Sequence, residues 1–168
     1  MTDTAPLTLH RATVRPEWID YNGHMNVAYY LLAFDQATDA VLDALGIGKA
    51  YVESENRSLF VVEAHLTYAR EVTEGDGLTF DTLVLGADAK RLHLFHTMRH
   101  DSEGFVAATA EFMLLHVDLT DRRAAPFPPA VASRVADLAR RHAALPRPVR
   151  AGRAIALPAR TPDGEGLS

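Results

Sequence analysis

The hydrophobic period of the chain changes once, and this change limits the folds that the chain can adopt. Between residues 26 and 45 the apolar side chains recur at helical spacing, whereas from Phe60 onward they alternate with polar ones. The first pattern predicts one long amphipathic helix, and the second predicts strands with one apolar face. One helix followed by consecutive strands favours an α+β domain, in which the helix lies across a curved antiparallel sheet of about five strands.

Local signals place the ends of these elements. Asn26 is a suitable N-cap and Gly46 a suitable stop, so the long helix lies between them. A first strand is expected at Leu7–Arg15, before Pro16, and a polar connection at Tyr51–Arg57. The later strands are expected at residues 60–69, 78–85, 91–100 and 105–118, joined by three consecutive hairpins.

The composition is that of one domain. The chain has 168 residues, of which 48% are hydrophobic, and it contains no cysteine. We expect a single domain at 1–142 that ends in a short helix at 130–142, followed by a Pro- and Arg-rich mobile tail at 143–168. The lack of cysteine excludes disulfides and thiolate chemistry, and together with the absence of a signal-like or membrane-spanning apolar stretch it favours a cytoplasmic location.

Charge is distributed unevenly along the chain. Residues 1–121 carry a net charge of −11, and residues 122–168 carry +6. Because nonspecific nucleic-acid binding needs many cationic contacts to phosphates, the acidic body argues against a nucleic-acid partner.

The chain also lacks the glycine-rich motifs of nucleotide hydrolysis and dinucleotide binding and the serine-hydrolase elbow.

Polar residues are concentrated just before the long helix, in the segment Glu17–Asn26. The first turn of a helix offers unpaired N–H groups and a partial positive charge, which can polarise a carbonyl. Asp20 lies upstream as a base or nucleophile, and Gly23 permits close backbone approach. A purely structural interpretation stays open, with Asp20 in an Asx turn and His24 as a surface or capping residue.

The segment Val14–Asn26 resembles the first motif of the hot-dog-fold acyl-CoA thioesterases, the 4-hydroxybenzoyl-CoA thioesterase-like family. The blocks Val62–Asp76 and Asp118–Pro128 resemble later parts of that family, so the likeness covers about residues 8–140. It implies a hot-dog fold that hydrolyses a small acyl-CoA thioester. Asp20 matches the catalytic carboxylate, Gly23 the family glycine, and the Val27 backbone N–H the donor to the thioester carbonyl. Members often carry an acid two residues before the catalytic one, where this chain has Trp18.

Within the family, the string from Trp18 to Asn26 most resembles thioesterases that act on betainyl-CoA. An aromatic cluster is compatible with a quaternary ammonium, with acidic Glu63 on a later strand. The substrate-binding residues expected on this basis are Trp18, Tyr21, Asn22, His24, Asn26, Tyr30 and Glu63. No cofactor is expected beyond the coenzyme A of the substrate.

An acidic body needs local cations to hold the phosphates of CoA. The candidates near strand ends and turns are Arg57, Lys90, Arg91, Arg122 and Arg123. One helix also leaves a long sheet partly uncovered, so we expect self-association as a dimer or tetramer.

Two alternatives stay open. Residues Asp20–His24 read D-x-N-x-H, which is similar to the D-x-N-P-x-H motif of hot-dog hydratases but lacks its proline. A non-catalytic hot-dog module that binds acyl-CoA is the other alternative. A metal site is not expected, because on one strand His93 faces away from His96 and His100.

Overall fold

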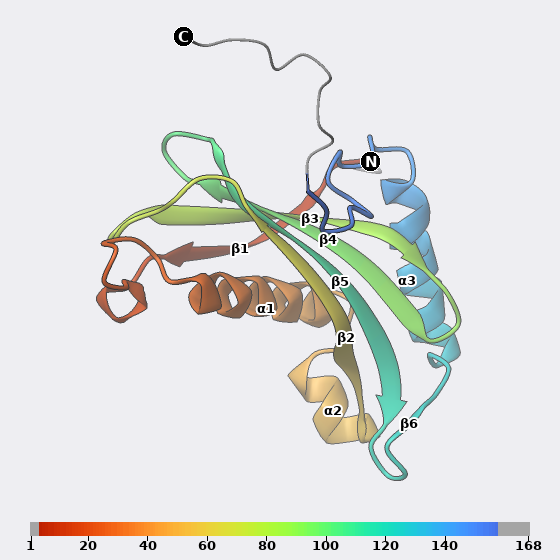
Figure 1. The fold of residues 1–168 in the computed structure, drawn as a ribbon. Coiled ribbons are helices and arrows are strands. Elements are labelled where there is room, and N and C mark those ends of the chain that lie inside the picture. Colours follow the sequence, from red (N-terminus) through yellow and green to blue (C-terminus); the bar gives the residue numbers. More distant parts are fainter. Residues whose placement is uncertain (1–3, 158–168) are drawn as a thin grey trace, which may run out of the picture.

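The computed structural model describes residues 4–157 and contains one six-stranded antiparallel sheet that curls around a central helix (Figure 1). The strand order is β1-β3-β4-β5-β2, and β6 pairs with β5. The strands are β1 (Leu7–Thr13), β2 (Arg57–Tyr68), β3 (Gly77–Ala87), β4 (Arg91–His100), β5 (Val106–Asp118) and β6 (Arg123–Ala124). The helices are the 3-10 turn η1 (Pro16–Trp18), α1 (Val27–Ala44), α2 (Lys49–Glu55) and α3 (Pro129–His142). The expected α+β hot-dog architecture is confirmed.

Helix α1 has the ends that the sequence predicts. The Asn26 side chain caps it by accepting a 2.9 Å hydrogen bond from the Ala28 N–H, and Gly46 follows with φ of +69°. Its apolar face, which includes Phe34 and Ala37, is buried against the sheet, and Phe34 meets Phe80 of β3 edge to face at 5.8 Å. This packing fixes the helix N-terminus at one end of the sheet.

The strands lie largely where alternation predicts them, but the first of the three expected hairpins is wrong. Strand β2 does not pair with β3; it pairs with β5 at the sheet edge, because β1 and β4 occupy both sides of β3. The connecting residues 69–76 cross the end of the sheet, where buried Val72 accepts a 2.9 Å hydrogen bond from the Met25 N–H. This crossing brings the end of β2 beside the segment that precedes α1.

The expected polar connection at Tyr51–Arg57 is also wrong, since most of it belongs to helix α2. Seven residues are too few to display a helical period. Tertiary contacts hold the element instead, and in one of them the buried Tyr51 hydroxyl lies 2.9 Å from His116 Nε2. The short helix expected at 130–142 is present as α3, which packs against β3.

Part of the predicted tail contacts the sheet. Arg150 donates a 2.9 Å hydrogen bond to Thr67 Oγ1, and the Gly152 N–H donates a 2.6 Å hydrogen bond to Glu111. The rest of the predicted tail, residues 158–168, lies outside the described residues.

Candidate active site

The segment before α1 folds into a tight turn. Ile19 and Met25 form an isolated antiparallel bridge, and between them the Asp20 N–H donates to the His24 carbonyl at 3.1 Å. The Gly23 N–H donates to the Asp20 carbonyl at 3.0 Å, and Gly23 has φ of +85°, which disfavours other residues. The turn therefore holds Asp20 at a fixed position next to the helix N-terminus.

The Asp20 carboxylate has one fixed oxygen and one free oxygen. Oδ1 accepts a 2.8 Å hydrogen bond from the Asn22 N–H, which is the Asx turn that the structural interpretation predicts. Within residues 4–157, Oδ2 has no hydrogen-bond partner. Asp20 can therefore stabilise the turn through Oδ1 and still act on a substrate through Oδ2.

The helix N-terminus presents one available donor. The Asn26 cap takes the Ala28 N–H, and the Tyr29 N–H donates to the Asn26 carbonyl at 3.0 Å. The Val27 N–H has no hydrogen-bond partner in the described part of the chain. Such an N–H at the positive end of a helix can stabilise negative charge on a thioester oxygen.

Asp20 and Val27 line a common pocket of about 360 Å³. That volume is near the lower end for small-molecule sites and suits a short acyl group. The pocket is lined by Asp20, His24, Met25, Val27, Tyr30, Tyr68, Ala69, Arg70 and Glu71. The first five come from the turn and α1, and the others from the end of β2 and the crossing connection.

Two tyrosines form an aromatic wall in this pocket. Tyr30 of α1 is 4% exposed and Tyr68 of β2 is 49% exposed, and their rings meet edge to face at 5.2 Å. Burial raises the pKa of the Tyr30 hydroxyl, and the nearby Glu71 carboxylate raises it further. Burial also raises the pKa of Tyr68. Both rings are therefore neutral phenols at physiological pH.

The polar groups of the crossing connection have distinct partners. Glu71 Oε2 lies 3.5 Å from His24 Nε2, so both groups belong to the pocket. The Arg70 guanidinium stacks on the Phe105 ring at 3.9 Å and pairs with Glu103 at 3.4 Å. The charge of Arg70 is therefore balanced by Glu103.

The structure brings together Asp20, Val27, His24 and Tyr30 among the residues expected from sequence. Gly23 supplies the turn and Asn26 the helix cap. Trp18 is 3% exposed and stacks on Tyr29 at 5.6 Å, so it belongs to the core and does not line the pocket. Tyr21 is 97% exposed, and Asn22 is exposed beside it on the outside of the turn.

Glu63 lies apart from this pocket. It lines a second pocket of about 370 Å³ with His65, His93 and Glu111, beneath the segment that contains Gly152. His93 Nε2 is 2.7 Å from Glu111, whereas His96 is buried on the opposite face of β4, as alternation predicts. No cluster of three or more ligand-type side chains suited to a metal ion occurs within residues 4–157.

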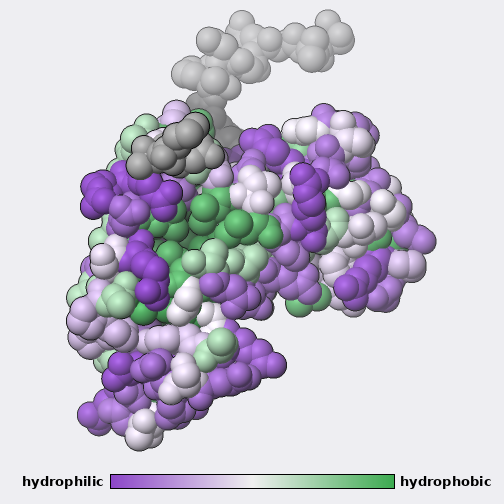
Figure 2. Space-filling model, turned by 180° about the vertical axis from the view of Figure 1, so that it is seen from behind, coloured by the Kyte–Doolittle hydropathy of each residue, from purple (hydrophilic) through white to green (hydrophobic). Residues whose placement is uncertain are grey.

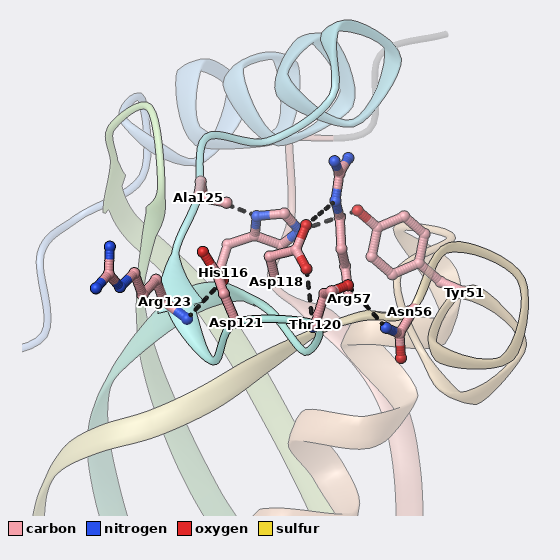
Figure 3. A network of polar contacts seen from close by, with 9 residues as sticks. All are labelled: Tyr51, Asn56, Arg57, His116, Asp118, Thr120, Asp121, Arg123 and Ala125. Atoms are coloured by element: carbon pink, nitrogen blue, oxygen red, sulfur yellow. Dashed lines mark hydrogen bonds and ion pairs between the residues drawn. The ribbon is translucent and has the colours of Figure 1, made fainter.

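Two of the candidate CoA-binding residues, Arg57 and Arg123, lie at the other end of the sheet beside Asp118 (Figure 3). Arg57 pairs with Asp118 at 3.3 Å, and Arg123 is the strand neighbour of the same aspartate. Arg57 begins β2, whose last residue is Tyr68, so roughly 36 Å of strand separates it from the Asp20 pocket at about 3.3 Å per residue.

The other three candidates share that end. The Lys90 carbonyl accepts from the His116 N–H, and Arg91 is the strand neighbour of Leu115 while pairing with Asp88 at 2.9 Å. Arg122 adopts φ of +56° and lies 5.9 Å from the Phe60 ring. Within one protomer, none of the five lines the pocket of Asp20.

Sequence reasoning missed Tyr68, Arg70 and Glu71. These residues were assigned to a strand end and its turn, and the hairpin expected there would have placed them beside β3. The sequence feature that could have located them is the group of aromatic and charged side chains at the end of the alternating strand and directly after it. Recognising it required knowing that the connection crosses the sheet end next to the Asp20 turn.

A curved antiparallel sheet around a central helix, with a carboxylate and an open N–H donor at the helix N-terminus, defines a thioester hydrolase of hot-dog fold. The chain belongs to the thioesterase-like superfamily, whose family model matches residues 14–135.

Individual relatives agree with this membership. The chain is 45% identical to the betainyl-CoA thioesterase of Pseudomonas aeruginosa, over 90% of this chain and 96% of that protein. It is 40% identical to the solved structure of a putative thioesterase from Pseudomonas putida, with a TM-score of 0.79, over 92% of this chain and 98% of that one. A Staphylococcus aureus hypothetical protein solved in complex with CoA is 30% identical, with a TM-score of 0.84 and the same coverage of both chains. None of the helices in the described part of the chain has the length and apolarity needed to cross a membrane.

Proposed function

We propose that this enzyme hydrolyses betainyl-CoA, with Asp20 and the Val27 N–H acting on the thioester. The observation that carries the proposal is that Asp20 Oδ2 and the Val27 N–H, neither of which has a hydrogen-bond partner within residues 4–157, share one small pocket. The betainyl group is short, which agrees with the pocket volume. The near full-length relative from Pseudomonas aeruginosa carries this substrate in its name.

The chemistry follows from these two groups. The Val27 N–H donates to the thioester oxygen, which becomes an oxyanion as the carbonyl carbon is attacked. Asp20 either attacks that carbon itself, giving a mixed anhydride that water then hydrolyses, or takes a proton from the attacking water. In both routes one water is consumed, the carbon–sulfur bond breaks, and CoA leaves as a thiolate that is protonated from solvent.

A dimer would complete the site. Strand β2 is a sheet edge whose outer side is unpaired in the described chain, and it exposes Phe60, Val61 and Val62. Hydrophobic surface is also visible in the centre of the face opposite to that of Figure 1, within a hydrophilic surround (Figure 2). An exposed apolar edge strand favours pairing with another strand, and a two-fold pair of identical strands is antiparallel.

Antiparallel pairing of β2 with its copy also explains the position of the candidate CoA-binding residues. It brings the Arg57 end of one protomer toward the Tyr68 end of the other, because the two ends are opposite ends of one strand. The five cations would then lie near the partner's Asp20 pocket. In this composite site the acyl group binds in one protomer and the phosphates meet the other, in a cytoplasmic enzyme that needs no further cofactor.

A thiol-release assay tests the function directly. We expect betainyl-CoA to be hydrolysed with a higher kcat/KM than aromatic and long-chain acyl-CoAs. A hydratase releases no thiol, and a binding module turns over no substrate. Thiol release that is absent for every acyl-CoA in the panel would contradict the proposal.

A further inference from the structure

The pocket beside Asp20 carries an excess of negative charge. Two carboxylates line it, those of Asp20 and Glu71, together with the cation Arg70 and with His24, whose Nε2 lies 3.5 Å from Glu71 Oε2. The Arg70 guanidinium is engaged by the Phe105 ring and by Glu103. Of the two carboxylates, Asp20 is required at the thioester carbon. Glu71 is therefore the carboxylate that is available to bind the part of the acyl group beyond the thioester carbonyl.

Glu71 has an aromatic wall beside it. Tyr30 and Tyr68 line the same pocket, with ring centres 5.2 Å apart and planes at 84°. Two rings set at a right angle form a corner, and the negative face of an aromatic ring attracts a cation. The corner joins α1 to the edge strand β2, so its shape is fixed by the fold.

A quaternary ammonium has a specific requirement that this corner meets. Its nitrogen carries a positive charge but no N–H, so it cannot be recognised by hydrogen-bond acceptors in the usual way. Aromatic faces and a nearby carboxylate supply attraction without needing a donor. The aromatic residues near the start of the motif do not supply this corner, since Trp18 and Tyr29 stack on each other and do not line the pocket.

We propose that Tyr30, Tyr68 and Glu71 form the subsite for a quaternary ammonium on the acyl group, and that they determine specificity for a cationic over a neutral acyl-CoA. This inference rests on the proposed function and assigns the residues that select its substrate. Asp20 and Val27 act on the thioester carbonyl, while the corner binds the trimethylammonium end.

A pair of isosteric substrates isolates the charge. Betainyl-CoA and 3,3-dimethylbutyryl-CoA have the same shape, but a neutral carbon replaces the charged nitrogen in the second. We expect the parent enzyme to prefer betainyl-CoA by at least roughly tenfold in kcat/KM, since cation–aromatic attraction and a carboxylate act together. The kcat/KM for the neutral compound therefore measures the effects of a substitution that do not depend on the charge of the acyl group.

Variants then assign the preference to residues. Glu71→Gln and Tyr68→Leu should each lower kcat/KM for betainyl-CoA by about fivefold to tenfold and leave the neutral isostere within about twofold. Tyr68→Phe keeps the ring face and should keep the preference. Glu74→Gln is the matched control, because Glu74 is exposed in the same connection and does not line the pocket.

A binding measurement separates this subsite from the hydrolysis itself. Calorimetry with the product glycine betaine should show tighter binding than with 3,3-dimethylbutyrate, and Glu71→Gln should abolish the difference. If glycine betaine binds in this way while no thioester is hydrolysed, the subsite stands and the proposed function fails. Equal loss on both substrates in Glu71→Gln and Tyr68→Leu, or an unchanged preference in both, overturns the subsite.

Discussion

Asp20 Oδ1 accepts a 2.8 Å hydrogen bond from the Asn22 N–H, so in the described part of the chain the turn that fixes this carboxylate uses one of its two oxygens and leaves Oδ2 without a partner. The bond needs an acceptor but not a charge. An asparagine in place of the aspartate can make the same bond through its amide oxygen. The geometry of the turn and the chemistry of the residue can therefore be separated by one substitution.

Asp20→Asn should lower kcat by at least about 10² while the protein stays folded, because the amide is neither a base nor a nucleophile at this position. Thiol release gives kcat, and thermal unfolding should give a Tm close to that of the parent. Near-parent turnover in this variant would show that Asp20 is only a turn residue.

His96 makes stability depend on pH. It is fully buried, with Nδ1 2.8 Å from Thr82 Oγ1 and Nε2 3.0 Å from Thr38 Oγ1. Since Thr38 donates its proton to the Phe34 carbonyl, His96 donates from Nε2 and accepts at Nδ1. Burial lowers the pKa of His96 from 6.5 to about 3.

The direction in which stability changes with pH depends on whether the folded or the unfolded state binds the proton more tightly. Between pH 6.5 and 3 the unfolded chain protonates this imidazole and the folded protein does not, so stability falls as the pH falls. The slope from this group approaches about 1.4 kcal/mol per pH unit. Burial lowers the pKa of His10 and His142 as well, which adds in the same direction.

Urea unfolding at pH 7 and pH 5 measures this dependence, and His96→Gln should reduce it. The glutamine amide retains one donor and one acceptor for the two threonines but does not titrate in this range. The same loss of stability between pH 7 and 5 in parent and variant would assign the dependence to other groups.

The sequence predicted α1, its cap and most strand positions, because these follow from local periodicity and from the chemistry of Asn26 and Gly46. It placed Asp20, Gly23 and Val27 together for the same reason, since all three lie within one turn and its helix. Strand neighbours are a tertiary property, and β2 shows that alternation identifies a strand without identifying its partner. The pocket residues Tyr68 and Glu71 depend on that partner, so local signals did not locate them.

Arg134→Ala should lower stability by about 1 kcal/mol and leave kcat unchanged. The Arg134 side chain of α3 donates from Nε to the Leu45 carbonyl at 2.8 Å, at the end of α1, which has no basic residue in its last turn. Arg140→Ala is the matched control, because Arg140 is on the same helix but is exposed and pairs with Asp137. Equal Tm values for the two variants would contradict this assignment.

Val62→Lys should convert the proposed dimer to a monomer and lower activity by more than about tenfold. Val62 is 55% exposed on the free edge of the sheet, where a lysine on each copy places like charges in contact. Leu9→Lys tests the opposite edge strand and should change neither quantity. Light scattering combined with the thiol assay decides the question, and a fully active monomer would exclude a composite site.

The cations at the far end of the sheet should affect KM and not kcat. Arg57 and Arg91 already pair with Asp118 and Asp88, whereas Lys90, Arg122 and Arg123 form no ion pair within residues 4–157.

The three free cations are therefore the best candidates for CoA phosphates. Because each exposed pair contributes under about 1 kcal/mol and is screened by salt, the triple variant Lys90→Ala, Arg122→Ala and Arg123→Ala should raise KM several-fold at low salt. The difference in KM between the parent enzyme and the triple variant should shrink as salt is added, because salt also screens the attraction between CoA and the cations of the parent enzyme. Arg11→Ala is the control, because Arg11 is exposed on β1 and pairs with Asp101. An unchanged KM at low salt would mean that backbone and apolar contacts anchor CoA.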